Sequence, residues 1–266
     1  MCRRTTTDPL VRAFLDRYGL NLLTVPRAAA SIGDLYVVQG GRVLPPASVN
    51  GFLRPTPQLP PARHETLADL SGVASSTISW EAGIGLFEGF LAALGAAALV
   101  DAVKAEYRRS QVASLSFRFS DCRRTSVDLG SLGSQLTGAR PDPDHPLWTS
   151  GSRYYLATGV VRSQSLSVRA ERADGQAAKL DLSVLRTAGV AAAVSVAQTG
   201  AAELRYAGTL RLAIGVELVE LRFDPIAGLR FLVQEATLNV REDTVPTRAF
   251  LGGPDDDAFI VVEPNP

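Results

Sequence analysis

The sequence predicts an α+β fold, in which a twisted antiparallel sheet is crossed by a long central helix and flanked by smaller helices. Three observations indicate this fold. Residues 204–218 alternate between apolar even positions and mostly polar or small odd positions, which is typical of a strand with one buried face. The turn Arg172-Ala173-Asp174-Gly175 is a hairpin signal between two β-like segments. Residues 82–109 are apolar on every side in their first half, as in a largely buried helix.

The first third of the chain predicts short elements. Thr7-Asp8-Pro9 supplies an N-cap and a first-turn proline, and Gly19 ends the helical spacing that follows. The expected elements are a helix over residues 10–18, strands over 21–25 and 34–39 before the turn Gly40-Gly41, a long mobile proline-rich loop over 45–61, and a strand over 75–80.

The middle of the chain predicts one main helix over residues 82–109. A strand over residues 112–119, a small polar helix near 127–136 and a loop over 139–146 follow. In the last third, residues 155–171 and 179–195 are expected to form the two arms of the hairpin. A long strand over 204–223, a turn over 225–228 and a strand over 229–240 complete the prediction.

The alternating strand that begins at Leu204 has two interpretations. About fifteen residues cover about 50 Å at 3.3 Å per residue, against a usual strand length of about 5–6 residues. The commoner origin of such a pattern is a half-exposed strand of an antiparallel sheet. The same pattern also suits a strand of a membrane barrel, which needs only about 9–11 tilted residues with lipid on one face. Alternation alone leaves both interpretations open.

Composition excludes several classes of function. The 266 residues suffice for one large domain or two small ones, and a formal net charge of zero argues against a nucleic-acid partner. No nucleotide-binding glycine motif or nucleophile elbow is present, and two histidines and two cysteines are too few to indicate a metal site. We therefore expect no enzyme activity, no catalytic residue and no metal. The longest apolar run, residues 89–100, is too short for a membrane helix, so we expect a cytoplasmic protein.

The C-terminal residues differ in charge from the rest of the chain. Residues 249–266 contain four acidic residues and no Lys or Arg, so residues 1–248 carry 27 basic groups against 27 − 4 = 23 acidic ones, a net +4. The tail is also rich in apolar side chains, which a free tail should lack. A solvated terminus is the ordinary interpretation of an acidic tail, whereas its apolar content favours docking on the body. The apolar side chains are Phe250, Leu251, Phe259, Ile260, Val261 and Val262.

Cys2 lies next to Arg3-Arg4 and before the predicted amphipathic helix. Cysteines in such positions are candidates for reversible S-acylation, for which nearby basic residues supply a second membrane signal. A reduced cysteine in a frayed terminus is the alternative.

In this order the features resemble the bacterial gasdermins. The resemblance rests on Cys2, the short first helix, the run Tyr18–Arg27 leading to Gly33-Asp34, the central apolar helix, the long amphipathic strands and the short tail. It implies a fold like the gasdermin N-terminal domain over residues 1–240, held inactive as a monomer by an autoinhibitory tail over 241–266. It further implies that a caspase-like or other protease removes the tail. The body then oligomerises into large pores in the inner membrane and kills the infected cell before phage can spread.

The resemblance also assigns roles to residues. It implies a palmitoylated Cys2, with no other cofactor, and membrane lipids as partners after cleavage. We expect cleavage between about residues 240 and 253; the candidate cleavage region contains Arg241, Thr244, Arg248 and Phe250, and the autoinhibitory contacts come from Phe259, Ile260, Val261 and Val262. The candidate lipid-facing residues are Leu210, Leu212, Ile214 and Val216, while Arg211 and Glu217 face water. The competing classes are a soluble β-rich binding module and a hydrolase of unrecognised type.

Overall fold

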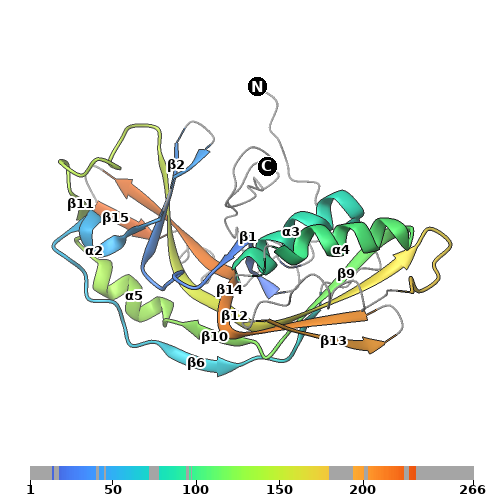
Figure 1. Ribbon diagram of the computed structural model, residues 1–266. Coiled ribbons are helices and arrows are strands. Elements are labelled where there is room, and N and C mark those ends of the chain that lie inside the picture. The colour runs from blue at the N-terminus through green and yellow to red at the C-terminus, as the bar shows by residue number, and fades with distance from the viewer. Residues whose placement is uncertain are drawn as a thin grey trace, which may run out of the picture.

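Two long antiparallel strands form the axis of the molecule in the computed structural model of the protein. They are β12 (Arg153–Arg172) and β14 (Glu203–Asp224), of 20 and 22 residues. Their register runs from Tyr154 opposite Leu221 to Arg169 opposite Glu203. Figure 1 shows the two strands passing through the whole molecule side by side. The structure describes residues 14, 18–39, 42–44, 46–71, 78–93, 96, 98–179, 194–200, 203–224 and 228–231.

The strands that flank this pair change along its length. At one end β12 pairs with β2 (Asp34–Gln39), which also pairs with β3 (Arg42–Val43) and β4 (Ala47–Ser48), and β14 pairs with β15 (Gly228–Phe231). In the middle β12 pairs with β10 (Arg123–Ser126), β10 with β6 (Arg63–Thr66), and β14 with β1 (Asn21–Arg27). At the other end β12 pairs with β9 (Val112–Ser120), β9 with β7 (Leu70–Ser71) and β8 (Ile78–Ser79), and β14 with β13 (Val194–Gly200).

Helices lie at both ends of the sheet. Figure 1 shows α3 (Trp80–Ala93) and α4 (Ala98–Arg109) on the right, above the part of the sheet that contains β9. On the left lie α2 (Val49–Phe52) and α5 (Leu129–Leu136), beside the short ribbon of β5 (Leu53–Arg54) and β11 (Arg140–Pro141). This mixed fold with one large antiparallel sheet confirms the predicted α+β class.

Among the residues that the structure describes, the buried apolar side chains form three clusters. One lies between α3, α4 and the β9 end of the sheet, and includes Phe87, Phe117 and Tyr206. A second lies at the α2 and α5 end and includes Phe52 and Leu156. The third lies at the centre and includes Tyr36, Tyr155 and Val216.

The prediction of one helix over residues 82–109 is wrong, because the structure has two helices there, α3 and α4. The residues between them include Gly95, which costs about 1 kcal/mol relative to Ala in a helix interior. After α3 the amide of Ala96 donates to the carbonyl of Leu91 at 2.8 Å, a wider turn than the α-helical one, and this turn ends the helix.

The prediction of a long mobile loop over residues 45–61 is wrong in part. This segment contains β4, α2 and β5. Ser48 caps α2 by accepting a hydrogen bond from the amide of Asn50 at 3.3 Å, and the helix buries Val49 and Phe52. Within the predicted strand 75–80 the described residues form β8 and the first residue of α3. Within the predicted loop 139–146, Arg140–Pro141 form β11.

The hairpin prediction is correct for the turn and wrong for the partner of the first arm. Gly175 adopts a positive φ of 76°, and the amide of Arg172 donates to the carbonyl of Gln176 at 2.9 Å. However, β12 pairs with β14 and β9, and Ser195 of the expected second arm belongs to β13, which pairs with β14. Residues 180–193 of that arm and the strand beyond Phe231 lie outside the described residues. The strands predicted at 21–25, 34–39, 112–119 and 204–223 and the helix near 127–136 are confirmed.

Candidate functional site: a sheet with one apolar and one polar face

The part of the sheet beside α3 and α4 has four main strands in the order β9–β12–β14–β13. Leu166 of β12 lies opposite Phe119 of β9 and Tyr206 of β14. Val168 lies opposite Phe117 and Leu204 in the same two strands. Because successive side chains of a strand point to opposite faces, these rows of apolar side chains share one face of the sheet.

This apolar face is packed against the two helices. Phe87 of α3 contacts the ring of Tyr206 with centroids 5.0 Å apart, and Phe90 of α3 lies 6.1 Å from Phe119. Eight apolar residues of β9, β12 and β14 form these rows, and each has at most 2% of its surface exposed. The helices of the same chain therefore seal this part of the face from water. The eight residues are Leu115, Phe117, Phe119, Leu166, Val168, Ala170, Leu204 and Tyr206.

The polar groups that α4 brings to this boundary are neutral or paired. Burial raises the pKa of Tyr107 above its ordinary value, although a hydrogen bond with Tyr206 acts in the other direction. Glu106 is buried, and its carboxylate lies 2.7 Å from Arg109 and accepts from Ser110 at 3.1 Å. The buried carboxylate of Glu106 therefore has a charged partner and a hydroxyl donor at the boundary of α4 with the sheet.

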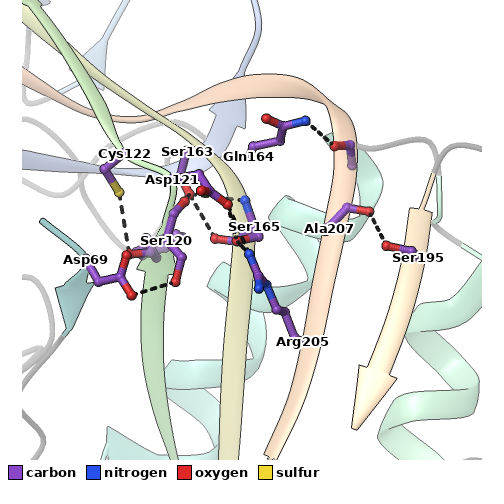
Figure 2. A network of polar contacts seen from close by, with 12 residues as sticks. Asp69, Ser120, Asp121, Cys122, Ser163, Gln164, Ser165, Ser195, Arg205 and Ala207 are labelled. Carbon is purple, nitrogen blue, oxygen red and sulfur yellow. Dashed lines mark hydrogen bonds and ion pairs between the residues drawn. The ribbon is translucent and has the colours of Figure 1, made fainter. Parts of the chain in front are cut away.

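The opposite face of the same four strands is polar. Arg205 of β14 donates to Asp121 at 3.0 Å and to the hydroxyl of Ser165 in β12 at 3.1 Å. The hydroxyl of Ser120 donates to Asp69 at 3.0 Å. Figure 2 shows this network joining β9, β12 and β14. Residues that alternate with the apolar rows include Ser116, Arg118, Ser120, Ser165, Ser167, Arg169, Glu171, Glu203 and Arg205.

The strands are long as well as two-faced. At about 3.3 Å per residue, the 20 residues of β12 extend over about 65 Å, several times the length of an ordinary strand. A strand that crosses the hydrocarbon core of a bilayer needs about 9–11 residues with alternating faces. The sheet therefore combines the length and the alternation that an apolar medium on one side and water on the other require.

The four candidate lipid-facing residues of β14 have three different environments in this fold. Leu210 is 57% exposed, Leu212 and Ile214 belong to the cluster beneath the helices, and Val216 belongs to the central cluster. The cause is the register, because residues 207–212 of β14 lie opposite only residues 163–165 of β12, and a further shift follows at Ala213. Their orientation toward lipid remains a prediction.

β9 is part of the site that the sequence interpretation did not assign. Its signal was present, since Leu115, Phe117 and Phe119 alternate with serine and arginine in the run Val112–Ser120. The alternation spans nine residues and was interpreted only as an ordinary strand; its place beside β12 and under α3 depends on tertiary contacts.

Enzyme-like features do not gather in the described part of the chain, where no group of three or more His, Cys, Asp and Glu is placed to hold a metal ion. His145 packs edge-on against Phe52 at 5.4 Å and accepts from the amide of Leu147, which is a structural role. Burial raises the pKa of the Cys122 thiol, which disfavours the reactive thiolate. Among the described residues, no helix combines the length and apolar character needed to cross a bilayer.

The other predicted site residues lie outside the described residues. They are Cys2, the candidate cleavage residues Arg241, Thr244, Arg248 and Phe250, and the tail residues Phe259, Ile260, Val261 and Val262.

Long strands with one apolar face, which helices of the same chain cover, would suit a protein that inserts strands into a membrane. Residues 23–229 match the model of the Bacterial Gasdermin Family. The chain therefore belongs to the bacterial gasdermin family, a family of pore-forming proteins without enzyme activity.

Two known proteins illustrate the relationship. The gasdermin bGSDM of Vitiosangium sp. (strain GDMCC 1.1324) is 27% identical over 222 residues, which are 81% of each chain. The structure of a bacterial gasdermin from Bradyrhizobium tropiciagri superposes with a TM-score of 0.63 at 17% identity, covering 86% of this chain and 93% of that one. The second likeness concerns the fold, and it agrees with the gasdermin-like sheet expected from the sequence.

Proposed function

We propose that the chain is an autoinhibited pore-forming protein that a protease activates. Residues 1–240 form the pore-forming body and residues 241–266 the inhibitory tail. A caspase-like or other protease cuts between them in the region of Arg241 to Phe250. The freed bodies then oligomerise into β-barrel pores in the bacterial inner membrane and kill the infected cell, which limits the spread of phage.

The observation that carries this proposal is the sealed apolar face that β9, β12 and β14 form under α3 and α4. In water this face is stable only while α3 and α4 cover it. In a bilayer the same side chains can contact lipid, while the serine and arginine residues of the other face line an aqueous lumen. Membership of a pore-forming family supports this use of the sheet.

The composition of the tail supports its proposed inhibitory role. Burying its six apolar side chains at roughly 1.5–3 kcal/mol each gives an upper bound on the order of 10 kcal/mol. Part of this free energy depends on the tether, because a short linker holds the tail at an effective concentration of about millimolar. Cleavage after Arg248 separates four acidic residues from a body of net charge +4, which favours anionic lipid.

Cys2 is proposed to carry a palmitoyl group, which adds to the membrane affinity of the neighbouring basic residues. The intact mass of the protein isolated from cells should therefore include a palmitoyl-sized addition that is absent from Cys2→Ala. Equal masses, after allowance for the substitution itself, would show that Cys2 is an unmodified thiol.

The proposed function is tested on the whole chain with a recognition sequence for a specific protease placed between Arg241 and Arg248. The protein is folded, mixed with vesicles of phosphatidylethanolamine and phosphatidylglycerol that contain a dye, and then cut. We expect dye release and oligomers only after cleavage, and loss of growth when the cut form is produced in a bacterium. If the cut chain stays a monomer and the vesicles stay sealed, the chain is a binding module and the proposal is wrong.

A further inference from the structure

An ion pair crosses an intervening strand in the middle of the sheet. In this region the strands lie in the order β6–β10–β12–β14, one beside the next (Figure 1). Arg124 of β10 and Glu217 of β14 are therefore separated by the whole width of β12. Nonetheless Nε and Nη2 of Arg124 each lie 2.9 Å from a carboxylate oxygen of Glu217. Nη1 of Arg124 reaches Glu65 of β6 at 3.3 Å, so that the contact includes four strands.

The contact depends on a glycine in the strand that is crossed. The register places Gly159 of β12 directly opposite Glu217. A Cβ atom at residue 159 would lie 2.3 Å from Oε2 of Glu217 and 2.8 Å from its Cδ. Only a residue without a side chain leaves room for the carboxylate to pass over β12 and meet the guanidinium.

The same position holds an irregularity of the register. Ala157 pairs with Leu218 and Gly159 with Glu217, so Thr158 is an extra residue on β12. Thr158 is held on both sides, because its hydroxyl donates to the carbonyl of Glu217 at 3.4 Å and its carbonyl accepts from Val127 at 3.0 Å. A one-residue slide here would turn every following side chain to the other face of the sheet.

The pair is well placed to resist such a slide. The side chains of Arg124 and Glu217 are 34% and 21% exposed, and the hydrogen bond that Arg124 donates to Glu217 raises the pKa of Arg124 above its ordinary value. Because the guanidinium of Arg124 contacts both carboxylate oxygens of Glu217, the pair holds β10 and β14 at a fixed distance. A single contact would let the two side chains rotate about each other.

We propose that Arg124 and Glu217, crossing β12 at Gly159, form a clamp that holds the β10–β12–β14 register of the inactive form and opens when the strands convert to the pore. This inference rests on the proposed function, since a converted β12–β14 ribbon must leave the short strand β10. In the pore, water in the lumen replaces Arg124 as the partner of Glu217. Breaking the clamp beforehand therefore lowers the barrier to conversion without adding any contact with lipid.

The test uses the cleavable full chain, with the dye-filled vesicles described above. Glu217→Gln removes the negative charge of the clamp with little change in shape, and Arg124→Gln removes its positive charge together with the contact to Glu65. The matched control is Glu220→Gln on the same strand, whose side chain is also 21% exposed but whose partner Arg222 lies two residues away on β14 itself. We expect the first two variants to shorten the lag between cleavage and dye release about three- to tenfold, while Glu220→Gln keeps the wild-type lag.

A second measurement follows the clamp in the uncut chain. Hydrogen exchange of the backbone amides in β10 and in the centre of β12 should be faster in Glu217→Gln than in Glu220→Gln. Wild-type lags in both clamp variants, a shorter lag in only one of them, or equal exchange in Glu217→Gln and Glu220→Gln would each overturn the clamp. If the cut wild-type chain releases no dye, the proposed function is wrong, and the exchange measurement still decides whether the pair locks the sheet.

Discussion

At the scale of single residues, burial controls which groups of this sheet stay neutral. Tyr107 lies between α3 and the sheet, and its hydroxyl is shielded from water together with that of Tyr206. Desolvation disfavours the phenolate, so the folded state retains a proton that the unfolded chain releases at high pH. High pH therefore favours the unfolded chain through the ionisation of Tyr107.

The free energy of unfolding should decrease above the ordinary tyrosine pKa of 10.0. Below that pH both states keep the proton, so the contribution of Tyr107 to stability is fully present. Above it only the unfolded chain is ionised, and stability decreases by up to about 1.4 kcal/mol per pH unit until the folded pKa is passed. Tyr107→Phe should show a shallower decrease in urea unfolding measured at several alkaline pH values. Parallel curves for the two proteins would contradict this assignment.

Two glycines act through the absence of a side chain, one by leaving space and the other by adopting a positive φ. Gly159 lets the carboxylate of Glu217 pass over β12, and Gly175 adopts the positive φ of the turn after β12. The Asp-Gly signal identified the turn in advance, because turn conformation is a local property. Nothing local to Gly159 indicates its role, since the atoms it accommodates come from a residue 58 positions further along the chain.

At the scale of elements, the residues of the single strand β14 lie in several different environments. Its alternation from Leu204 onward was predicted and is confirmed as one strand. The register of β14 against β12 nonetheless shifts three times, and Leu210, opposite the shift between Ser163 and Ser165, lies at the surface while Leu212 is buried under the helices. A pattern that is regular in the sequence is therefore distributed among different environments in the fold.

Leu210 permits a test of lipid contact that does not disturb the fold. Because its side chain is 57% exposed, Leu210→Arg should change the free energy of unfolding by less than about 0.5 kcal/mol. On a lipid-facing strand the same charge costs about 2–4 kcal/mol per subunit at the bilayer mid-plane. We expect dye release by the cut chain to be abolished. The control is Thr209→Arg, an exposed neighbour that points to the other face and should release dye normally. Equal release by both variants would mean that this part of β14 does not face lipid.

The break between α3 and α4 is a feature of the elements that the sequence did not predict. An apolar run over residues 82–109 predicted one buried helix, and the structure has α3 and α4 instead. Lys104 of α4 forms an ion pair with Glu88 of α3, so the two helices pack together on the sheet. The break lets α3 and α4 fold against each other while both contact β9.

At the scale of the whole molecule, the proposed activity depends on whether the apolar face of the sheet is more stable under α3 and α4 or in contact with lipid. In the proposed function α3 and α4 would stay with the body after cleavage, so removing the tail would not itself uncover the apolar face. Cleavage would instead change the charge and the contacts of the body, and lipid would supply the alternative environment for the face. For this reason the cleavage experiment should show a lag, and the length of that lag measures the stability of the covered sheet.

The cleavage prediction has a matched control at this scale. A peptide of the tail, added to the cut chain before the vesicles, should match the inhibition of the uncut chain only at concentrations approaching the effective concentration of the tether, about millimolar. Inhibition as strong as that of the uncut chain at far lower concentrations would mean that tethering contributes little.

The sequence by itself determined the two-faced character of the strands, the turn at Asp174-Gly175 and the helix near residue 129, which Asp128 caps. These features were predictable because side-chain periodicity, capping and turn conformation depend on residues a few positions apart. The tertiary structure alone decided that β12 pairs with β14 and β9 rather than with residues 179–195, and that Glu217 meets Arg124 across β12. Strand pairing and the covering of an apolar face depend on free energies summed over contacts between distant segments. No single segment carries that information in its own pattern.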